Sequence, residues 1–218
     1  MKPCDCSNRH DRRRVVLTGG PGAGKTAALE LVRLFFCTHV HTLPESAGIV
    51  FGGRFPRDGR AEIRQAAQRA IFHVQRELET SEDSDDAAVV LCDRGTVDGS
   101  AYWAGPGDLF SSVGTTRESE LARYHAVIHL RTPSSPDAYG RANPLRIETL
   151  EEAGAIDHRI ADAWSGHPRH FDIQATPDFL TKVAQTLQIL REQVPECCRR
   201  HVKPFLWDQS TSGPGGPA

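Results

Sequence analysis

The sequence predicts an α/β fold in which helices cover both faces of a parallel β-sheet. Short continuous apolar runs at 87–91 and 126–130 are typical of strands that are buried on both faces. Apolar residues recur every three or four positions over 60–79, which is typical of an amphipathic helix. Because such strands alternate with helices along the chain, we expect a parallel sheet built from right-handed crossovers.

Five strands and four main helices account for most of the chain. We expect strands at 15–18, 38–43, 87–91, 126–130 and 171–173. We expect helices at 25–36, 60–79 and 147–164, and a last one that begins with Thr176 as its N-cap and Pro177 in its first turn. One domain is predicted over 13–195, with terminal extensions at 1–12 and 196–218.

A glycine-rich motif follows the first predicted strand. Residues 19–26 match G-x-x-x-x-G-K-[ST], and a helix-forming segment comes directly after them. Glycine allows backbone conformations that point successive N–H groups at phosphate oxygens, and the helix start adds further unpaired N–H groups. We therefore expect a nucleotide site, with Lys25 on the β/γ-phosphates and the Thr26 hydroxyl on Mg²⁺. The predicted nucleotide-binding residues are Gly19, Gly20, Pro21, Gly22, Ala23, Gly24, Lys25, Thr26 and Ala27.

Asp93 ends a buried apolar run and has the position of a Walker B carboxylate, a second candidate ligand of Mg²⁺. The next residue is Arg94, where hydrolytic motors usually carry a glutamate that polarises water. Transfer to a bound hydroxyl needs positive charge around the γ-phosphate, so this pair favours a kinase. The sequence has no [NT]-K-x-D guanine motif and no L-S-G-G-Q signature, which favours adenine nucleotides and argues against ordinary GTPases and transporter ATPases.

Polar residues follow every predicted strand, and the carboxyl ends of parallel strands meet at one edge of the sheet. The residues expected to share this edge are Gly19, Glu45, Asp93, Arg131 and Gln174. Glu45 follows Pro44, where small-molecule kinases often keep an acid that accepts the substrate proton. The same glutamate could instead interact with the dipole of a following helix. Either Glu45 or Asp93 could be the base.

The loop after the fourth strand carries two further candidate site residues. Residues 131–146 are rich in Pro, Ser and Gly and include Arg141 and Arg146. An arginine-bearing loop that closes over the phosphates would exclude water and neutralise charge. We predict Arg141 as a nucleotide contact and Arg146 as a catalytic residue.

Composition excludes several other classes of protein. The 218 residues carry a net charge of −2, which does not favour a nucleic-acid partner or a membrane surface. The apolar runs are shorter than a membrane span needs, and the polar first fourteen residues do not resemble a secretory signal. A cytoplasmic location is expected.

The six cysteines fall into two groups. Cys37 and Cys92 lie in apolar runs and are predicted to be small buried residues. Cys4, Cys6, Cys197 and Cys198 lie in the polar ends of the chain. Cys4, Cys6 and His10 have no C-x-x-C pair to match them, so the spacing favours a reduced tail over a metal site.

These motifs together resemble the NadR-type ATPase/kinase domain family, which also includes the TRPL translocation defect protein. The resemblance covers about residues 13 to 195. It rests on Gly19–Thr26, Pro44-Glu45, Leu91-Cys92-Asp93-Arg94-Gly95, Asn143-x-x-Arg146-x-Glu148, Ala163-Trp164 and His167-Pro168-Arg169. It implies a three-layer, nucleoside/nucleotide-kinase-like P-loop fold with a five-stranded parallel sheet and bound ATP. It does not fix the acceptor.

The sequence therefore favours an ATP-binding protein that moves the γ-phosphoryl group, with Mg²⁺, to a small, nucleoside-like hydroxyl acceptor. Lys25 and Arg146 would carry phosphate charge, and Arg94 would steady the transferred group or the substrate. The rival hypotheses are a non-catalytic module that reports ATP or GTP occupancy to a partner and a simple ATPase. Turnover with a panel of nucleosides and sugars would distinguish them.

Overall fold

The computed structural model describes residues 4–6, 8–82, 87–134, 149–176, 178–200 and 202. Its centre is a five-stranded sheet in the order β2-β3-β1-β4-β5. Every neighbouring pair is parallel. The prediction of an α/β fold with a five-stranded parallel sheet is confirmed. The strands are β1 (Arg13–Thr18), β2 (Val40–Leu43), β3 (Val89–Asp93), β4 (Ala126–Leu130) and β5 (His170–Ile173).

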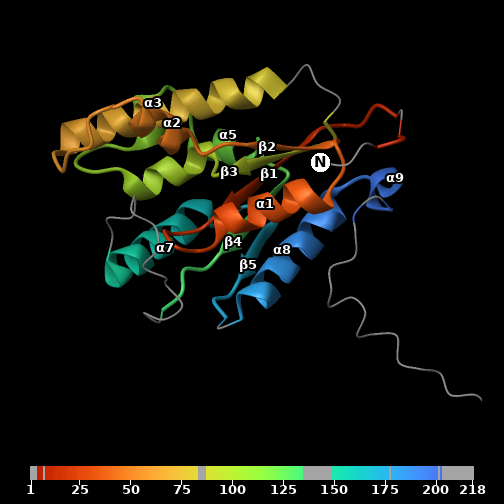
Figure 1. Ribbon diagram of the computed structural model, residues 1–218. Coiled ribbons are helices and arrows are strands. Elements are labelled where there is room, and N and C mark those ends of the chain that lie inside the picture. Colours follow the sequence, from red (N-terminus) through yellow and green to blue (C-terminus); the bar gives the residue numbers. More distant parts are fainter. Residues whose placement is uncertain are drawn as a thin grey trace, which may run out of the picture.

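Helices cover both faces of this sheet (Figure 1). The longer ones agree closely with the predicted segments, and three short helices and a 3₁₀ segment within the domain were not predicted. The helices are α1 (Lys25–Phe35), α2 (Ser46–Gly52), α3 (Ala61–Ser81), the 3₁₀ segment η2 (Thr96–Tyr102), α4 (Leu109–Ser112), α5 (Arg117–Leu121), α7 (Leu150–Trp164), α8 (Phe179–Gln193) and α9 (Glu196–Arg199).

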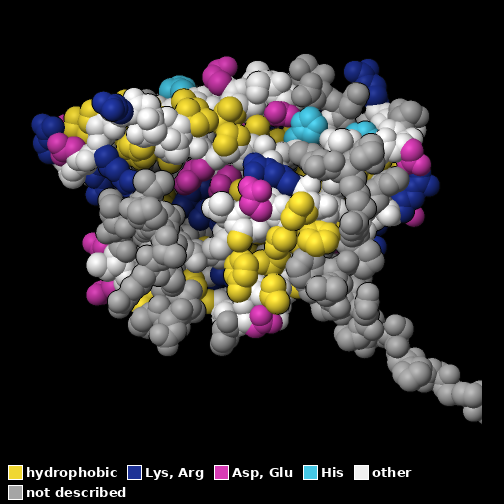
Figure 2. Space-filling view, viewed as in Figure 1, with side chains coloured by type: hydrophobic (Ala, Val, Ile, Leu, Met, Phe, Trp, Pro, Cys, Tyr) yellow, Lys and Arg dark blue, Asp and Glu magenta, His cyan; other side chains and the backbone are white. Residues whose placement is uncertain are grey.

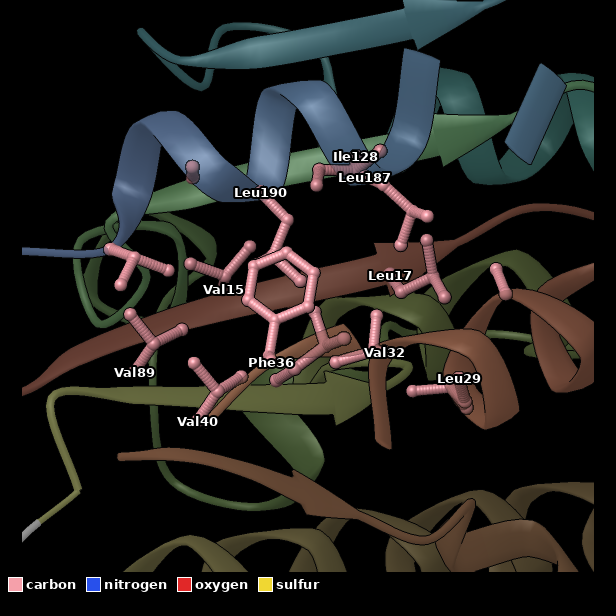
Figure 3. Close-up of a cluster of buried hydrophobic side chains, with 14 of the residues drawn as sticks. Val15, Leu17, Leu29, Val32, Phe36, Val40, Val89, Ile128, Leu187 and Leu190 are labelled. Carbon is pink, nitrogen blue, oxygen red and sulfur yellow. The ribbon is translucent and has the colours of Figure 1, made fainter. Parts of the chain in front are cut away.

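Two hydrophobic clusters form the core, one on each face. In β1 the alternation of side chains sends Val15 and Leu17 to one face and Val16 to the other. On the first face α1 and α8 pack around Phe36, which lies among strand side chains in Figure 3. On the second face α7 contributes Trp164, which is fully buried. Burial on both faces explains the continuous apolar runs in the sequence.

Two predicted boundaries were wrong. The third strand is Val89–Asp93 rather than 87–91, and Asp93 is its last residue, the position expected of a Walker B carboxylate. The last helix is capped by Asp178, whose carboxylate accepts hydrogen bonds from the Leu180 and Thr181 amides. Thr176 is therefore not the N-cap. An aspartate two residues further on accepts from the orphan N–H groups of the helix, where its negative charge also favours the dipole.

The surface of this molecule is mixed in character. Figure 2 shows hydrophobic side chains gathered on the face where α1 and α8 lie side by side in Figure 1. Leu34 in α1 and Phe179 and Leu180 in α8 are exposed large apolar residues. Among the described residues, no helix is both long and apolar enough to cross a membrane.

Candidate active site

The glycine-rich loop joins β1 to α1 at the carboxyl edge of the sheet. Gly19 and Gly24 have φ angles of 137° and 98°, a region that side chains other than glycine rarely adopt. A Cβ on Gly19 would lie 2.1 Å from the Leu130 carbonyl oxygen, so β4 packs directly against the loop backbone. Gly24 is the N-cap of α1 and has no side-chain cap, which leaves the helix N–H groups available to a ligand.

Lys25 is directed back over this loop. Its Nζ donates hydrogen bonds to the carbonyl oxygens of Gly19, at 2.9 Å, and Gly20, at 3.2 Å. Burial, together with the charge of Arg94, lowers the pKa of Lys25 to about 8. The ammonium is thus held by neutral carbonyl groups in a poorly solvated position, where an anionic phosphate would be a stronger partner.

The carboxylate of Asp93 has one oxygen, Oδ1, without a hydrogen-bond partner among the described residues. The side chain is buried. Burial raises the pKa of Asp93 to about 6, although the positive charge of Lys25 opposes that shift. A buried carboxylate oxygen without a partner beside a phosphate-binding loop fits a magnesium ligand, because Mg²⁺ binds oxygen and takes one or two carboxylates together with substrate phosphates.

Glu45, which follows β2, and Arg94, which follows β3, form an ion pair at this edge of the sheet. Arg94 donates from Nε to Glu45 Oε1 over 2.7 Å, and its guanidinium lies over the Tyr102 ring. Burial would raise the pKa of Glu45, but the charges of Arg94 and Lys25 outweigh it and lower that pKa. Glu45 is therefore ionised at neutral pH. It is also the N-cap residue of α2, but its side chain makes no cap hydrogen bond, so its carboxylate is directed to Arg94.

Arg94 has an unusual backbone. Its φ is 71°, in a region that non-glycine residues rarely adopt. Its amide donates to the Leu17 carbonyl oxygen, which ties this turn to β1. Strained residues gather at functional sites where the surroundings fix them. Here the strain aims the guanidinium at Glu45 and at Asp98.

Asp98, in η2, is a site residue that the sequence did not predict. It is buried and accepts hydrogen bonds from the Gly95 amide, at 2.9 Å, and the Trp164 indole, at 3.1 Å. It also accepts from the Thr18 hydroxyl and faces Arg94 Nη1 at 3.3 Å. Asp98 thus fixes Arg94 relative to the end of β1. No pattern in the sequence identified Asp98, because the 3₁₀ segment that carries it was not predicted.

Asp157, in α7, is the second unpredicted residue, and it supports the other side of the loop. It accepts hydrogen bonds from the Gly20 amide, at 2.8 Å, and from His129 Nε2, at 3.0 Å, and it pairs with Arg131 at 3.4 Å. Burial would raise the pKa of Asp157, but the hydrogen bonds from His129 and Gly20 outweigh it and lower the pKa well below its usual range. Unlike Asp93, this carboxylate is fully partnered.

The structure brings most of the predicted site residues together. Gly19, Glu45, Asp93, Arg131 and Gln174 all lie at the carboxyl edge of the sheet, as expected for parallel strands. Thr26 and Ala27 are exposed in the first turn of α1, and Pro21, Gly22 and Ala23 form the loop between Gly20 and Gly24. Arg141 and Arg146 lie outside the described residues.

Comparisons with known proteins support the fold described above. A family model described as AAA domain (AAA_28) matches residues 14–179. Solved structures with the same fold include deoxyadenosine kinase from M. mycoides with bound dATP, with a TM-score of 0.57 and 13% sequence identity. They also include thymidylate kinase from Ehrlichia chaffeensis, with a TM-score of 0.56 and 15% identity. Each alignment covers 82% of this chain and 98% of the solved chain. No curated protein matches the sequence.

Proposed function

Because this chain belongs to the AAA domain family and has the P-loop fold of nucleoside and nucleotide kinases, we propose that it is an ATP-dependent kinase. Its acceptor is a small nucleoside-like molecule with a free hydroxyl group. The observation that carries the proposal is the Asp93 carboxylate, whose buried Oδ1 has no hydrogen-bond partner in the described part of the chain, near Lys25 and the Arg94–Glu45 pair. These are the charges that phosphoryl transfer needs: cations for the phosphates, an oxygen ligand for Mg²⁺ and a carboxylate for the acceptor proton.

Asp93 and the Thr26 hydroxyl would hold Mg²⁺, which neutralises phosphate charge when it is bound. The Asp93 oxygen fits this role because its burial is not compensated by a hydrogen bond. Lys25 would leave the carbonyl oxygens of its own loop and bind the β/γ-phosphates. The exposed position of Thr26 leaves its hydroxyl open to that region.

Glu45 is the better candidate for the base. It is partly exposed and ionised, so it can reach an acceptor hydroxyl and take its proton. Asp93 is buried and would be occupied with the metal. Arg94 would hold Glu45 in place and add positive charge at the γ-phosphoryl group. We propose in addition that Arg141 and Arg146 belong to a loop that closes over the phosphates.

The experiment is a coupled assay of ADP release with ATP or GTP and Mg²⁺, run against nucleosides, nucleoside monophosphates and sugars. Acceptor-dependent release, with ATP preferred over GTP, supports the kinase. Release that no acceptor changes supports a simple ATPase. Tight nucleotide binding without any release supports the regulatory module. The NadR-type resemblance does not fix the acceptor, so the acceptor panel is kept broad. We also propose a cytoplasmic location and no nucleic-acid partner.

A further inference from the structure

Thiol and imidazole groups from three parts of the chain meet at the amino edge of the sheet. They come from the N-terminal segment, from the turn before β2 and from α9, and they are Cys4, Cys6, His10, Cys37, His39, Cys197 and Cys198. Figure 1 shows the N-terminal segment and α9 at the same end of the molecule. This edge is opposite the glycine-rich loop, because β2 begins here and β1 ends at the loop.

Four of these groups have the spacing of a tetrahedral metal site. Cys6 Sγ lies 3.4 Å from His10 Nε2 and 3.4 Å from Cys197 Sγ, and Cys197 Sγ lies 3.5 Å from His10 Nε2. Cys198 Sγ lies 3.9 Å from both Cys197 Sγ and His10 Nε2. The ligand atoms of Cys6, His10, His39 and Cys198 all lie within 4.8 Å of one another. Cys197 joins this group through its distances to Cys6, His10 and Cys198. Zn–S bonds of about 2.3 Å separate tetrahedral sulfur ligands by about 3.8 Å.

A second set of four surrounds the same thiol. Cys198 also groups with Cys4, Cys37 and His39, whose ligand atoms lie within 4.8 Å of one another. His39 Nδ1 is 3.3 Å from Cys198 Sγ, and Cys4 Sγ is 3.9 Å from it. Cys37, His39 and Cys198 are buried. Cys198 therefore belongs to both groups, and every other member of the two groups offers a nitrogen or sulfur ligand.

We propose that this cluster binds Zn²⁺ through Cys6, His10, Cys197 and Cys198. Thiolate and imidazole ligands select zinc over magnesium and calcium, which prefer oxygen. Four protein ligands leave no open position, so the site is structural rather than catalytic. The six cysteines are all free thiols, and the Sγ atoms of Cys6 and Cys197 are 3.4 Å apart, too far for a disulfide bond and suitable for two ligands of one ion.

The ion would tie the two ends of the chain to the core. Cys6 and Cys197 are separated by 191 residues, and the same ends are joined by an exposed ion pair between Arg200 and Asp5. A surface ion pair of this kind contributes little. A metal bound by both ends would restrict the unfolded chain over nearly its whole length, as a long-range cross-link does. Removal of the ion should therefore reduce stability without affecting the nucleotide edge.

The experiment measures metal in the full-length protein purified without added chelator. We expect one zinc ion per chain by mass spectrometry, or two that share Cys198. After exchange into Co²⁺, the protein should show the thiolate-to-cobalt charge-transfer band and the strong visible bands of a tetrahedral site. A zinc-selective chelator should lower Tm by about 5 °C or more while ATP-analogue affinity changes less than twofold.

Matched variants separate the cluster from the other thiols. Cys197→Ser and His10→Asn should lose zinc and the cobalt bands, whereas Cys92→Ala, a buried thiol in β3, should keep both. If Cys197→Ser does not fold, the wild-type cobalt spectrum and the His10→Asn variant still test the proposal. A zinc-free wild type that gives no cobalt bands would overturn it. So would a zinc-free protein in which intact mass shows a disulfide between Cys6 and Cys197.

Discussion

The two sides of the glycine-rich loop hold buried aspartates in opposite states. On the α7 side, Asp157 is bound by an amide, an imidazole and a guanidinium, and its pKa is lowered. On the β3 side, Asp93 keeps an oxygen without a partner, and burial raises its pKa to about 6. Both residues are buried, so exposure does not explain the difference.

The contrast separates architecture from function at this edge. A satisfied carboxylate stabilises the fold and fixes the loop backbone through Gly20. An unsatisfied one costs stability, and folded proteins rarely keep such a group unless a ligand completes it. We propose that the β3 side of the site binds the cation and the substrate and that the α7 side supports the loop.

Replacing Lys25 should have the largest effect. Lys25→Ala removes the only charge of the loop, and we expect turnover to fall by about 10³-fold or more with the fold intact. Steady-state ADP release and circular dichroism measure the two effects. Lys182→Met is the matched control, since Lys182 is also buried with its pKa lowered to about 8 but donates to the Arg131 carbonyl instead. Equal losses in both variants would contradict the assignment.

Arg146 should matter next, and in a different way. An arginine that meets the γ-phosphoryl group in the closed state contributes to the transition state, so Arg146→Ala should lower kcat by about 10³-fold and change ATP affinity much less. Steady-state kinetics together with equilibrium binding separate the two parameters. An unchanged kcat would mean that residues 131–146 only connect two elements.

Replacing Asp93 should lower activity and raise stability. Asp93→Asn should lower turnover by about 10²-fold and raise the free energy of unfolding at pH 7 by about 1 kcal/mol. The pKa of Asp93 in the folded protein lies above the usual 3.8, so ionisation of this carboxyl lowers the free energy of unfolding of wild type as the pH rises from about 4 to about 6. The advantage of the variant should disappear below pH 4 in urea unfolding curves. If Asp93→Asn had a lower free energy of unfolding than wild type at pH 7, the ionised Asp93 side chain could not be a destabilising buried charge.

The matching change on the α7 side should have the opposite sign. Asp157→Asn should lower the free energy of unfolding at pH 7 by about 2 kcal/mol, because hydrogen bonds to a charged group are lost. The folded pKa of Asp157 is depressed, so its contribution is present above the unfolded value of 3.8 and is lost as the pH falls below it. The difference in the free energy of unfolding between Asp157→Asn and wild type should therefore become smaller below about pH 4. A difference that does not vary with pH would exclude the charge as its cause.

The sequence predicted the strands and the loop well, for local reasons. Continuous apolar runs identified β1, β3 and β4 because their side chains are buried on both faces. The motif at 19–26 and the strand-end positions of Glu45 and Asp93 followed from local spacing and from parallel order. The error at the last helix arose because Thr176 was taken as the N-cap, whereas Asp178, two residues later, caps the helix.

What the sequence could not predict depends on contacts between distant residues. Asp98 and Asp157 are ordinary acidic residues in the sequence, and only tertiary packing aims them at Arg94 and Gly20. The cysteines were treated as unrelated because their partners lie at the other end of the chain. Cys6 precedes β1 and Cys197 follows α8, and the two thiols meet because α8 packs on the face of the sheet that Val15 and Leu17 of β1 line.

The central claim is that Asp93 is completed by Mg²⁺ when nucleotide binds. Isothermal titration of a non-hydrolysable ATP analogue, with and without Mg²⁺, tests it in wild type, Asp93→Asn and Asp157→Asn. We expect Mg²⁺ to strengthen binding by about tenfold or more in wild type and in Asp157→Asn, and to have no effect in Asp93→Asn. An equal effect of Mg²⁺ in all three proteins would contradict the claim.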